Sequence, residues 1–401
     1  MTAPTDSKAE AEVEAEEQAE ADRVPDLLYS ETETDLRDSV RSLLTARCRP
    51  EDVLPRADGQ GDGAGGDVGL WHALAADLGC ASLLVPEDDD GAGASFREAA
   101  TVAEELGRSV APVPYLGSAV VATMALLSAG DHRTLPELAR GDVTAALAVG
   151  FATAPGDPFP RTARLSGPRP GDGGGTARLR GEVRGVADAL DADLLLVPAD
   201  GVPHALYVVG AGAEGVRRTP VSSLDMTRPL CDIELTDAEA RLVASGPAAD
   251  DAFQLALLAG AAALAAEQLG VAEKCLEMTV AYVKERRQFA RPVGSFQGLK
   301  HRLADLWVSI TQARAAARYA AGCLAEGHDD TPVAVALAKA HCGDAAVHAA
   351  EECVQMHGGI GFTWEHPAHL YLKRAKADSI GFGTSDHHRQ SLATLVNLPR
   401  A

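Results

Sequence analysis

Small residues recur at helical spacing near the C-terminus, and this pattern restricts the fold more than any other feature of the chain. The intervals are 4, 3, 4, 4 and 3 residues, and the series is Ala338, Cys342, Ala345, Ala349, Cys353 and Met356. Small side chains on one face permit the close approach of a second helix. A second apolar seam, with steps of 3, 4, 3 and 4, comprises Phe296, Leu299, Leu303, Leu306 and Ile310. Two such helices predict a C-terminal four-helix bundle over residues 248–401.

The rest of the chain divides into segments of different texture. Residues 1–24 are rich in Ala and Glu and predict a disordered acidic tail. Residues 25–143 show helical spacing interrupted by loops, which predicts an N-terminal helical domain. Residues 144–247 hold short apolar runs separated by Gly, Pro and Asp, which predict a small antiparallel β domain. The predicted fold is therefore mostly α with a small β domain in the middle.

The composition limits the compartment and the partners. A net charge of −22, from 58 acidic and 36 basic residues, disfavours nucleic acid as a partner. The seven cysteines form no CxxC pair and no zinc-like spacing, which is typical of a reduced, cytosolic protein. The N-terminus has no signal pattern, and the longest apolar run, 255–266, is too short to span a bilayer. We therefore expect a cytoplasmic protein that neither enters membranes nor binds nucleic acid.

One stretch, residues 284–302, concentrates positive charge in this acidic chain. It holds one acid, Glu285, against the six basic residues Lys284, Arg286, Arg287, Arg291, Lys300 and Arg302. Guanidinium groups at a helix–helix corner could hold a phosphate or pyrophosphate. A basic helix end that satisfies the macrodipole and neighbouring acids explains the pattern equally well.

A second stretch, Gln355–Asp386, contains two glycine-bearing loops around one short helix. The first loop is Gln-Met-His-Gly-Gly-Ile-Gly-Phe at 355–362, and the second contains Gly-Thr-Ser at 383–385. Their backbone N–H groups could meet an anion, although helix-capping turns give the same spacing. His341, Asp344 and His348 share one helix face, but a polar stripe is the better interpretation, and no metal site is predicted.

These motifs together make the sequence similar to the acyl-CoA dehydrogenase family. The match rests on Glu-Arg-x-Gln-Phe at 285–289, Phe-Gln at 296–297, the 355–362 loop and Gly-Thr-Ser at 383–385. The resemblance implies an N-terminal helical domain, a middle β-barrel and a C-terminal four-helix bundle that bind FAD and an acyl-CoA thioester. It also implies FAD contacts from Arg286, Phe289, Gln297, Gln355, Gly359 and Thr384. In the family the first five reach the flavin nucleotide of the neighbouring subunit.

The sequence departs from the family where the chemistry is done. Family members remove the α-proton with a glutamate directly before Gly-Thr-Ser, and this position carries Phe382. Some members place the glutamate on an earlier helix, where this chain has Gly260. Neither residue can accept a proton, so no catalytic residue is assigned in this chain. The flavin contacts of the middle domain are reduced to Thr-Ala-Pro at 153–155 and Gly-Val-Ala at 185–187.

The losses affect the chain's own flavin and substrate, whereas the residues offered to a neighbour remain. We therefore expect the base-lacking subunit of a heteromeric acyl-CoA dehydrogenase, such as the actinobacterial α2β2 enzymes. A base-carrying subunit, an acyl-CoA and an electron-transfer flavoprotein or similar acceptor would be its partners. Two alternatives stay open: a self-sufficient dehydrogenase with a relocated base, for instance Glu365 or an acid of the first domain, and a non-redox acyl-thioester-binding or scaffold protein.

Overall fold

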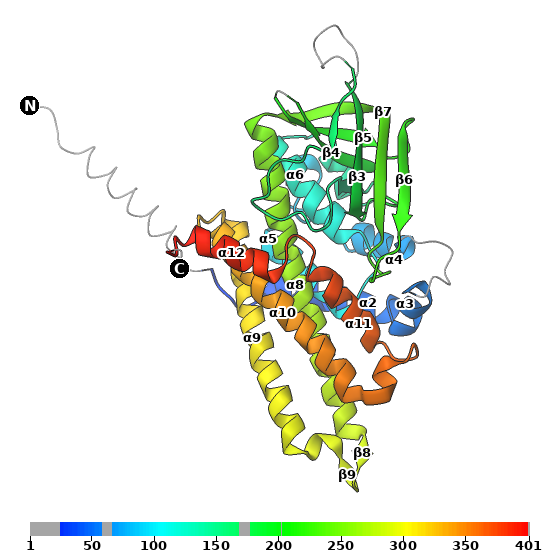
Figure 1. The fold of residues 1–401 in the computed structure, drawn as a ribbon, viewed down its shortest axis with the longest axis vertical. Coiled ribbons are helices and arrows are strands. Elements are labelled where there is room, and N and C mark those ends of the chain that lie inside the picture. The colour runs from blue at the N-terminus through cyan, green and yellow to red at the C-terminus, as the bar shows by residue number, and fades with distance from the viewer. Residues whose placement is uncertain (1–24, 58–65, 168–176, 202, 400–401) are drawn as a thin grey trace, which may run out of the picture.

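The computed structural model describes residues 25–57, 66–167, 177–201 and 203–399, so the predicted tail at 1–24 lies outside the described residues. Figure 1 shows a β domain at one end of the molecule and a bundle of long helices that runs away from it. The N-terminal helices pack against both parts. This order is the one predicted from the sequence.

The N-terminal domain is built from short helices that begin at favourable capping residues. Ser30 and Ser95 each form a capping box, with Glu33 and Glu98 respectively, which satisfies the first N–H groups of the helix. Two π-helical segments, η1 and η3, continue into or out of α-helices. The elements are α2 (Glu31–Arg47), α3 (Pro50–Ala57), α4 (Val68–His72), η1 (Ala73–Asp77), η2 (Glu87–Asp89), α5 (Phe96–Ser109), η3 (Tyr115–Ala122), α6 (Thr123–Ala129) and α7 (Leu135–Ala139).

The middle domain is a closed barrel, because β5 pairs with both β4 and β7 and so joins the two ends of the strand order β4-β2-β3-β7-β5. Most pairings are antiparallel, as predicted, but β1 and β2 both run parallel to β4. Both are three-residue strands joined to their neighbours by long connections, which parallel pairing requires. The strands are β1 (Ala145–Leu147), β2 (Ala163–Leu165), β3 (Ala177–Ala187), β4 (Leu194–Asp200), β5 (Ala205–Gly210), β6 (Val216–Val221) and β7 (Leu230–Ser245).

The C-terminal domain contains the three longest helices and two short ones, in agreement with the predicted bundle. A short hairpin, β8–β9, forms the corner between α8 and α9 at the far end of the molecule (Figure 1). The elements are α8 (Pro247–Glu285), β8 (Arg287–Gln288), β9 (Arg291–Pro292), η4 (Val293–Ser295), α9 (Gln297–Glu326), α10 (Thr331–His357), η5 (Gly358–Phe362), α11 (Ala368–Asp378) and α12 (Ser385–Leu395).

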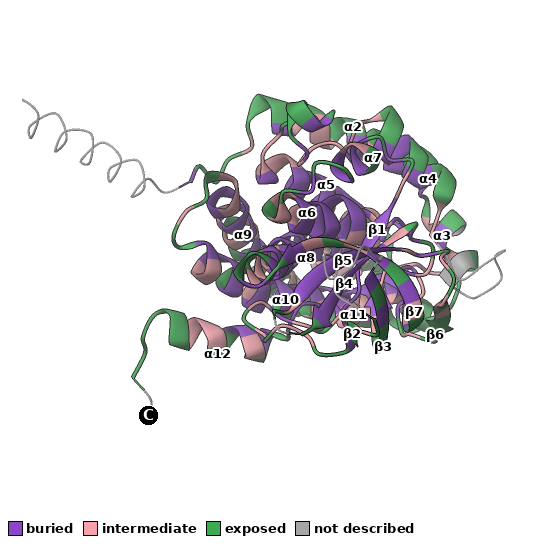
Figure 2. Cartoon of the chain, turned by 90° about the horizontal axis from the view of Figure 1, so that it is seen from above, coloured by how far each residue is buried: buried purple, intermediate pink, exposed green. Residues whose placement is uncertain are grey.

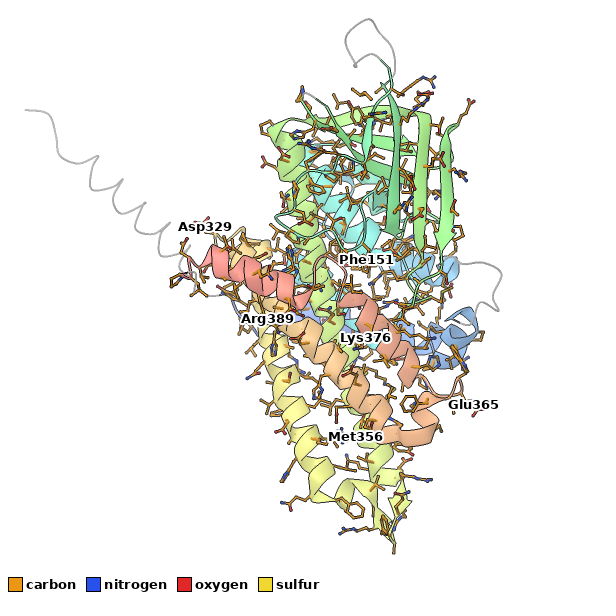
Figure 3. The ribbon with its side chains drawn as sticks, in the orientation of Figure 1. Phe151, Asp329, Met356, Glu365, Lys376 and Arg389 are labelled. Atoms are coloured by element: carbon orange, nitrogen blue, oxygen red, sulfur yellow. The ribbon has the colours of Figure 1, made fainter. Side chains whose placement is uncertain are left out.

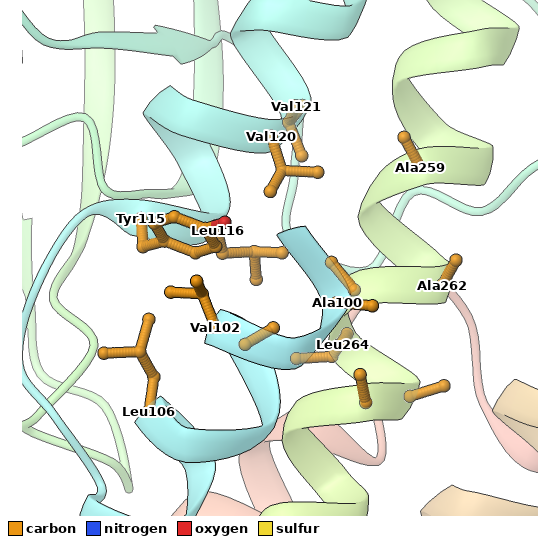
Figure 4. Packing of buried hydrophobic residues seen from close by; sticks show 14 of the residues in the cluster. Ala100, Val102, Leu106, Tyr115, Leu116, Val120, Val121, Ala259, Ala262 and Leu264 are labelled. Atoms are coloured by element: carbon orange, nitrogen blue, oxygen red, sulfur yellow. The ribbon is translucent and has the colours of Figure 1, made fainter. Parts of the chain in front are cut away.

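Helix α8 is the central element of the helical part. Among the described residues it is the one helix long and apolar enough to cross a membrane, but 89% of its most apolar window is buried, as in a core helix. Seen from above, buried residues follow α8, α10 and the barrel strands and also α5 and α6 of the N-terminal domain (Figure 2). Side chains of α5, η3 and α8 interdigitate in this core, among them Leu106, Leu116 and Leu264 (Figure 4).

Glycines allow α5 and α8 to touch. A Cβ placed on Gly107 would lie 2.1 Å from the carbonyl oxygen of Glu267, and one on Gly270 would lie 1.9 Å from that of Glu104. Neither glycine could therefore be replaced without moving one helix. This contact fixes the N-terminal domain on α8.

A buried cluster of charged side chains joins the barrel to the helices. Arg374, which is 1% exposed, donates to Asp225 at 2.5 Å and also to Glu267, and Arg228 donates to Glu267 and to Asp378 at 2.7 Å. Burial alone would raise the pKa of Glu267, but Arg228 and Arg374 outweigh burial and hold that pKa below its usual value. Burial and the neighbouring Glu267 raise the pKa of Asp378 to about 8, so at pH 7 the two guanidiniums face two charged carboxylates, Asp225 and Glu267, out of water.

Candidate functional site: a closed interior and an open hairpin pocket

The two positions at which the family carries its base face each other. Phe382 follows α11, Gly260 lies on α8, and a Cβ placed on Gly260 would lie 2.7 Å from Cζ of Phe382. The same Cβ would lie 2.9 Å from Cγ2 of Val121. The phenylalanine ring therefore fills the space into which a longer side chain at 260 would project.

A second ring completes the closure. Phe151 packs edge-on against Phe382, with 5.7 Å between ring centroids, and its carbonyl oxygen accepts the backbone N–H of Phe382 at 2.8 Å. The cavity that remains beside the rings is about 30 Å³, which is room for about two water molecules. Asp188 is the one titratable residue that lines it, and burial raises the pKa of this carboxyl. We call Phe151, Phe382, Gly260 and this cavity the closed site.

Buried side chains fix the loop that carries Phe382. Lys339 donates to the carbonyl oxygens of Asp378 and Gly383, at 2.9 and 3.3 Å, and Nε2 of His388 lies 2.8 Å from that of Phe382. Burial lowers the pKa of His388 to about 4, so the ring is neutral at pH 7 and donates from Nε2. These three hydrogen bonds hold the loop of Phe382 in place.

A larger cavity of about 500 Å³ adjoins the closed site, between the barrel and α11. Gly185 lines it where the family has a flavin wall, and no atom lies within 4 Å of a Cβ placed there. Its cations are already paired: Arg184 with Glu182, Lys376 with Glu351, and Arg228 within the buried cluster. The cavity has room for a ring system, but Phe151 is the one aromatic residue among its described lining residues, and none of its cations is free of an acidic partner, so it is a poor fit for a flavin of this chain.

The predicted cofactor residues gather elsewhere, at the β8–β9 hairpin. Four of them, Arg286, Phe289, Gln355 and Gly359, line one pocket of about 470 Å³, which we call the hairpin pocket. Gln297 begins α9 next to it but does not line it. Thr384 lies apart, because its hydroxyl caps α12 by accepting the N–H of His387. Their role as FAD contacts stays a prediction.

The hairpin pocket is open and basic, which fits part of a dinucleotide. Gly359 has an ordinary φ, and apart from its chain neighbours no atom of the described residues lies within 4 Å of a Cβ placed on it, so the space above it is free for a ligand. Arg286 makes no ion pair within the described residues. Phe289 is 86% exposed, at the tip of the hairpin. A phosphate group and an aromatic base would both find complementary groups here.

Three further residues of the hairpin pocket were not assigned from the sequence: Tyr282, Arg302 and His357. His357 is buried; its Nδ1 lies 2.6 Å from the carbonyl oxygen of Cys353, and its ring packs 4.4 Å from that of Tyr282. All three lie inside or directly beside the two stretches that the sequence singled out. Their position there was the available signal, but only the fold shows which of them reach the pocket.

Comparison with known proteins identifies the family. Residues 30–149 match the N-terminal domain model of acyl-CoA dehydrogenases, and residues 251–396 match the C-terminal domain model. The chain is 37% identical over 347 residues to acyl-CoA dehydrogenase IpdE2 of Mycobacterium tuberculosis, covering 85% of this chain and 89% of the relative. The chain belongs to the acyl-CoA dehydrogenase family.

Solved structures of this family share the fold. A chain of the ChsE4-ChsE5 complex from Mycobacterium tuberculosis is 29% identical, with a TM-score of 0.81 and coverage of 94% of this chain and 100% of that one. A chain of a variant of the Tcur3481-Tcur3483 steroid acyl-CoA dehydrogenase is 30% identical, with a TM-score of 0.78 and coverage of 92% and 98%. The predicted family, fold, enzyme class and FAD as the cofactor of that class are confirmed at this level.

Proposed function

We propose that this chain is the non-catalytic half of a heteromeric acyl-CoA dehydrogenase and lends FAD contacts to a base-carrying partner subunit. One observation carries the proposal: the ring of Phe382 occupies the space above Gly260, so both base positions are filled without a base. Removal of an α-proton requires a group with a free lone pair at the reacting carbon, and neither side chain has one.

The separation of the two sites supports an intersubunit role. Gly260 and Tyr282 are 22 residues apart on the continuous helix α8, which corresponds to about 33 Å along its axis. A cofactor held at the hairpin pocket is therefore too far away to oxidise a substrate at this chain's own closed site. When bound, FAD supplies the two-electron oxidant of the family reaction. This chain's residues would orient its nucleotide end, and the partner would hold the acyl-CoA and remove the proton.

The similar structures favour a heteromer, since both are described as two-component assemblies. The partner would be an acyl-CoA dehydrogenase subunit with a glutamate at one of the two base positions. We further propose that electrons leave through an electron-transfer flavoprotein or similar acceptor, and that the complex is cytoplasmic. The seven free, buried cysteines are consistent with a reducing compartment.

A flavin spectrum tests the proposal. The chain purified alone is expected to show no stoichiometric flavin absorbance and no acyl-CoA dehydrogenation. Co-expression with a base-carrying acyl-CoA dehydrogenase is expected to yield a complex that contains FAD and turns over. Arg286→Ala should remove FAD from that complex without dissolving it. Full FAD occupancy and turnover by the chain alone would refute the proposal.

Phe382→Glu tests the closed site directly. The new carboxylate would enter a cavity of about 30 Å³ beside Phe151, so we expect lower stability and no dehydrogenation by the purified chain. Phe382→Leu is the control, because it keeps the position apolar. If Phe382→Glu creates activity without a partner, the chain's own flavin site is intact and the proposal is wrong.

A self-sufficient enzyme is the second candidate, and Asp188 is the observation in its favour. Glu365 is an unsuitable base because it is exposed and far from Phe151 (Figure 3). Asp188, by contrast, lines the closed site, and burial raises its pKa toward the range of a general base. If the chain alone proves active, loss of that activity in Asp188→Asn would establish this alternative. A scaffold without redox function would give neither a flavin-containing complex nor turnover.

A further inference from the structure

The hairpin pocket contains a second guanidinium that the family motifs do not account for. Arg286 and Arg302 both line it, and none of its described lining residues is acidic. Arg302 lies on α9, five positions after Gln297, whereas Arg286 lies at the end of α8. Two cations from different helices on one pocket favour a ligand with more than one negative charge.

A buried carboxylate holds Arg302 in place. One terminal nitrogen of Arg302 donates to Oε1 of Glu352, which is buried on α10 one turn before Gln355. No other hydrogen bond of the Arg302 side chain is present among the described residues, so most of its five donors remain available to the pocket. A buried ion pair is weak evidence for stability, and its better-supported use is to fix the position of a group.

We propose that Arg302, positioned by Glu352, is a second phosphate-binding cation of the hairpin pocket. The inference rests on the proposed function, in which this chain orients the nucleotide end of FAD, and it adds Arg302 and Glu352 to the residues that would hold the diphosphate there. Three aromatic rings, Tyr282, Phe289 and Phe296, line the same pocket, and the exposed ring of Phe289 offers a face for a purine. Arg286 and Arg302 would each hold oxygens of the diphosphate.

Glu352 is a positioning residue in this arrangement and does not touch the ligand. Its second oxygen, Oε2, is buried and has no hydrogen-bond partner in the described part of the chain. Burying a carboxylate with only one hydrogen bond costs free energy. We therefore infer that the role of Glu352 is to orient the guanidinium of Arg302. Replacing it should therefore weaken ligand binding through Arg302, and Arg302→Lys should not restore the fork geometry.

Calorimetric titration of the full-length chain with ADP, AMP and adenosine tests the inference. The unaltered chain is expected to bind ADP more tightly than AMP. Arg302→Gln should weaken ADP binding by about 10- to 100-fold and remove the preference over AMP. Glu352→Gln should have a smaller effect of the same kind. Lys300→Gln removes the same charge from an exposed residue of α9 that does not line the pocket, and should change binding by less than about 2-fold.

The outcomes separate this inference from the proposed function. Equal losses in Arg302→Gln and Lys300→Gln would mean a general field effect and would overturn the inference, as would the absence of saturable ADP binding. Loss of FAD from the co-expressed complex in Arg286→Ala, together with unchanged FAD content in Arg302→Gln, would keep the proposed function and reject the role of Arg302. Circular dichroism melting of each variant shows whether the fold is intact.

Discussion

Two phenylalanines with the same backbone strain occupy opposite environments. Phe382 has φ 51° and is 6% exposed, whereas Phe289 has φ 50° and is 86% exposed. A left-handed conformation is unfavourable for a bulky residue and persists only where the surroundings enforce it. Around Phe382 the enforcing contacts belong to this chain: Phe151, His388 and the packing on α8. Around Phe289 the chain supplies the two-residue turn of the β8–β9 hairpin, in which Phe289 and Ala290 both have positive φ, and an edge contact from Phe296 at 6.1 Å between ring centroids.

The difference shows where each region is completed. The closed site is finished within the chain and has no room for a reactant. The hairpin pocket remains open in this chain: within the described residues Arg286 has no ion pair, the Phe289 ring is exposed, and the space above Gly359 is empty. Under the proposed function, a chain without a base of its own would keep the surface that completes the flavin site of its partner subunit.

The largest expected effect concerns the buried charges beneath the closed site. Arg374→Met leaves Asp225 and Glu267 short of a partner and should lower the free energy of unfolding by about 3–5 kcal/mol, measured by urea denaturation. Arg389→Met is the matched control on an exposed pair with Asp344 and Asp386, and should change it by about 1 kcal/mol or less. Equal effects would mean that the interior is less rigidly defined than we argue.

The next effect is a pH dependence of stability that arises from His388, whose ring contacts the carbonyl oxygen of Phe382. The pKa of His388 is lowered from 6.5 to about 4 in the fold, so the folded state binds fewer protons than the unfolded state between these values. Its stabilising contribution is complete above pH 6.5 and is lost as the pH falls toward 4, by up to about 3 kcal/mol. His388→Gln retains a donor for the Phe382 carbonyl and should flatten the unfolding profile in this window. An unchanged slope would contradict the assignment.

The features of the fold and the site that could be predicted are those determined by residues close to one another in the sequence. The helical seams, several strands and the family motifs follow from spacing, so the sequence predicts the architecture and both base positions. It does not predict that Phe382 lies on Gly260, because 122 residues separate them and only the packing of α8 against the loop joins them. The short apolar runs do not predict strand β6, because Arg217, Arg218 and Pro220 resemble a polar loop, although an edge strand tolerates them.

The sequence also does not predict which charged side chains are buried in the core. Arg374 and Lys339 are completely or almost completely buried, whereas composition alone would place them on the surface. Thr384 was grouped with the other cofactor residues by motif, yet it caps α12, apart from the hairpin pocket. Trp307 and Trp364 are 60% and 59% exposed, although tryptophan side chains are on average highly buried. Each of these features depends on which helices and strands pack against one another, and the spacing of residues in the sequence does not determine this.

One substitution placed in the interior gives a third effect. Gly260→Ala puts a Cβ at 2.7 Å from the Phe382 ring and 2.9 Å from Val121, so either the ring or α8 must move. Overpacking of this kind should lower the free energy of unfolding by about 1–3 kcal/mol. Thermal unfolding of the chain alone measures it. A neutral result would show that the closed site can open.

The same substitution at the hairpin pocket gives the smallest effect on the fold. Gly359→Ala meets no atom within 4 Å and no positive φ, so the stability of the free chain should change by about 0.5 kcal/mol or less. The methyl group would occupy the free space above the pocket, and FAD content of the co-expressed complex should fall. Full FAD content in Gly359→Ala would mean that the cofactor does not approach this glycine.

Helix α8 has a consequence for how such an assembly can vary. Its 39 residues form one unbroken rod of about 58 Å that carries Gly260 in the interior and Tyr282 at the hairpin pocket. Because the helix has no break, the number of residues between Gly260 and Tyr282 fixes both the distance of the hairpin pocket from the closed site and the direction in which the pocket faces. One residue added between these positions would turn the pocket by about 100° around the axis while shifting it by only about 1.5 Å. Insertions or deletions in the loops of the barrel are therefore compatible with a site shared between subunits, whereas insertions or deletions within α8 are not.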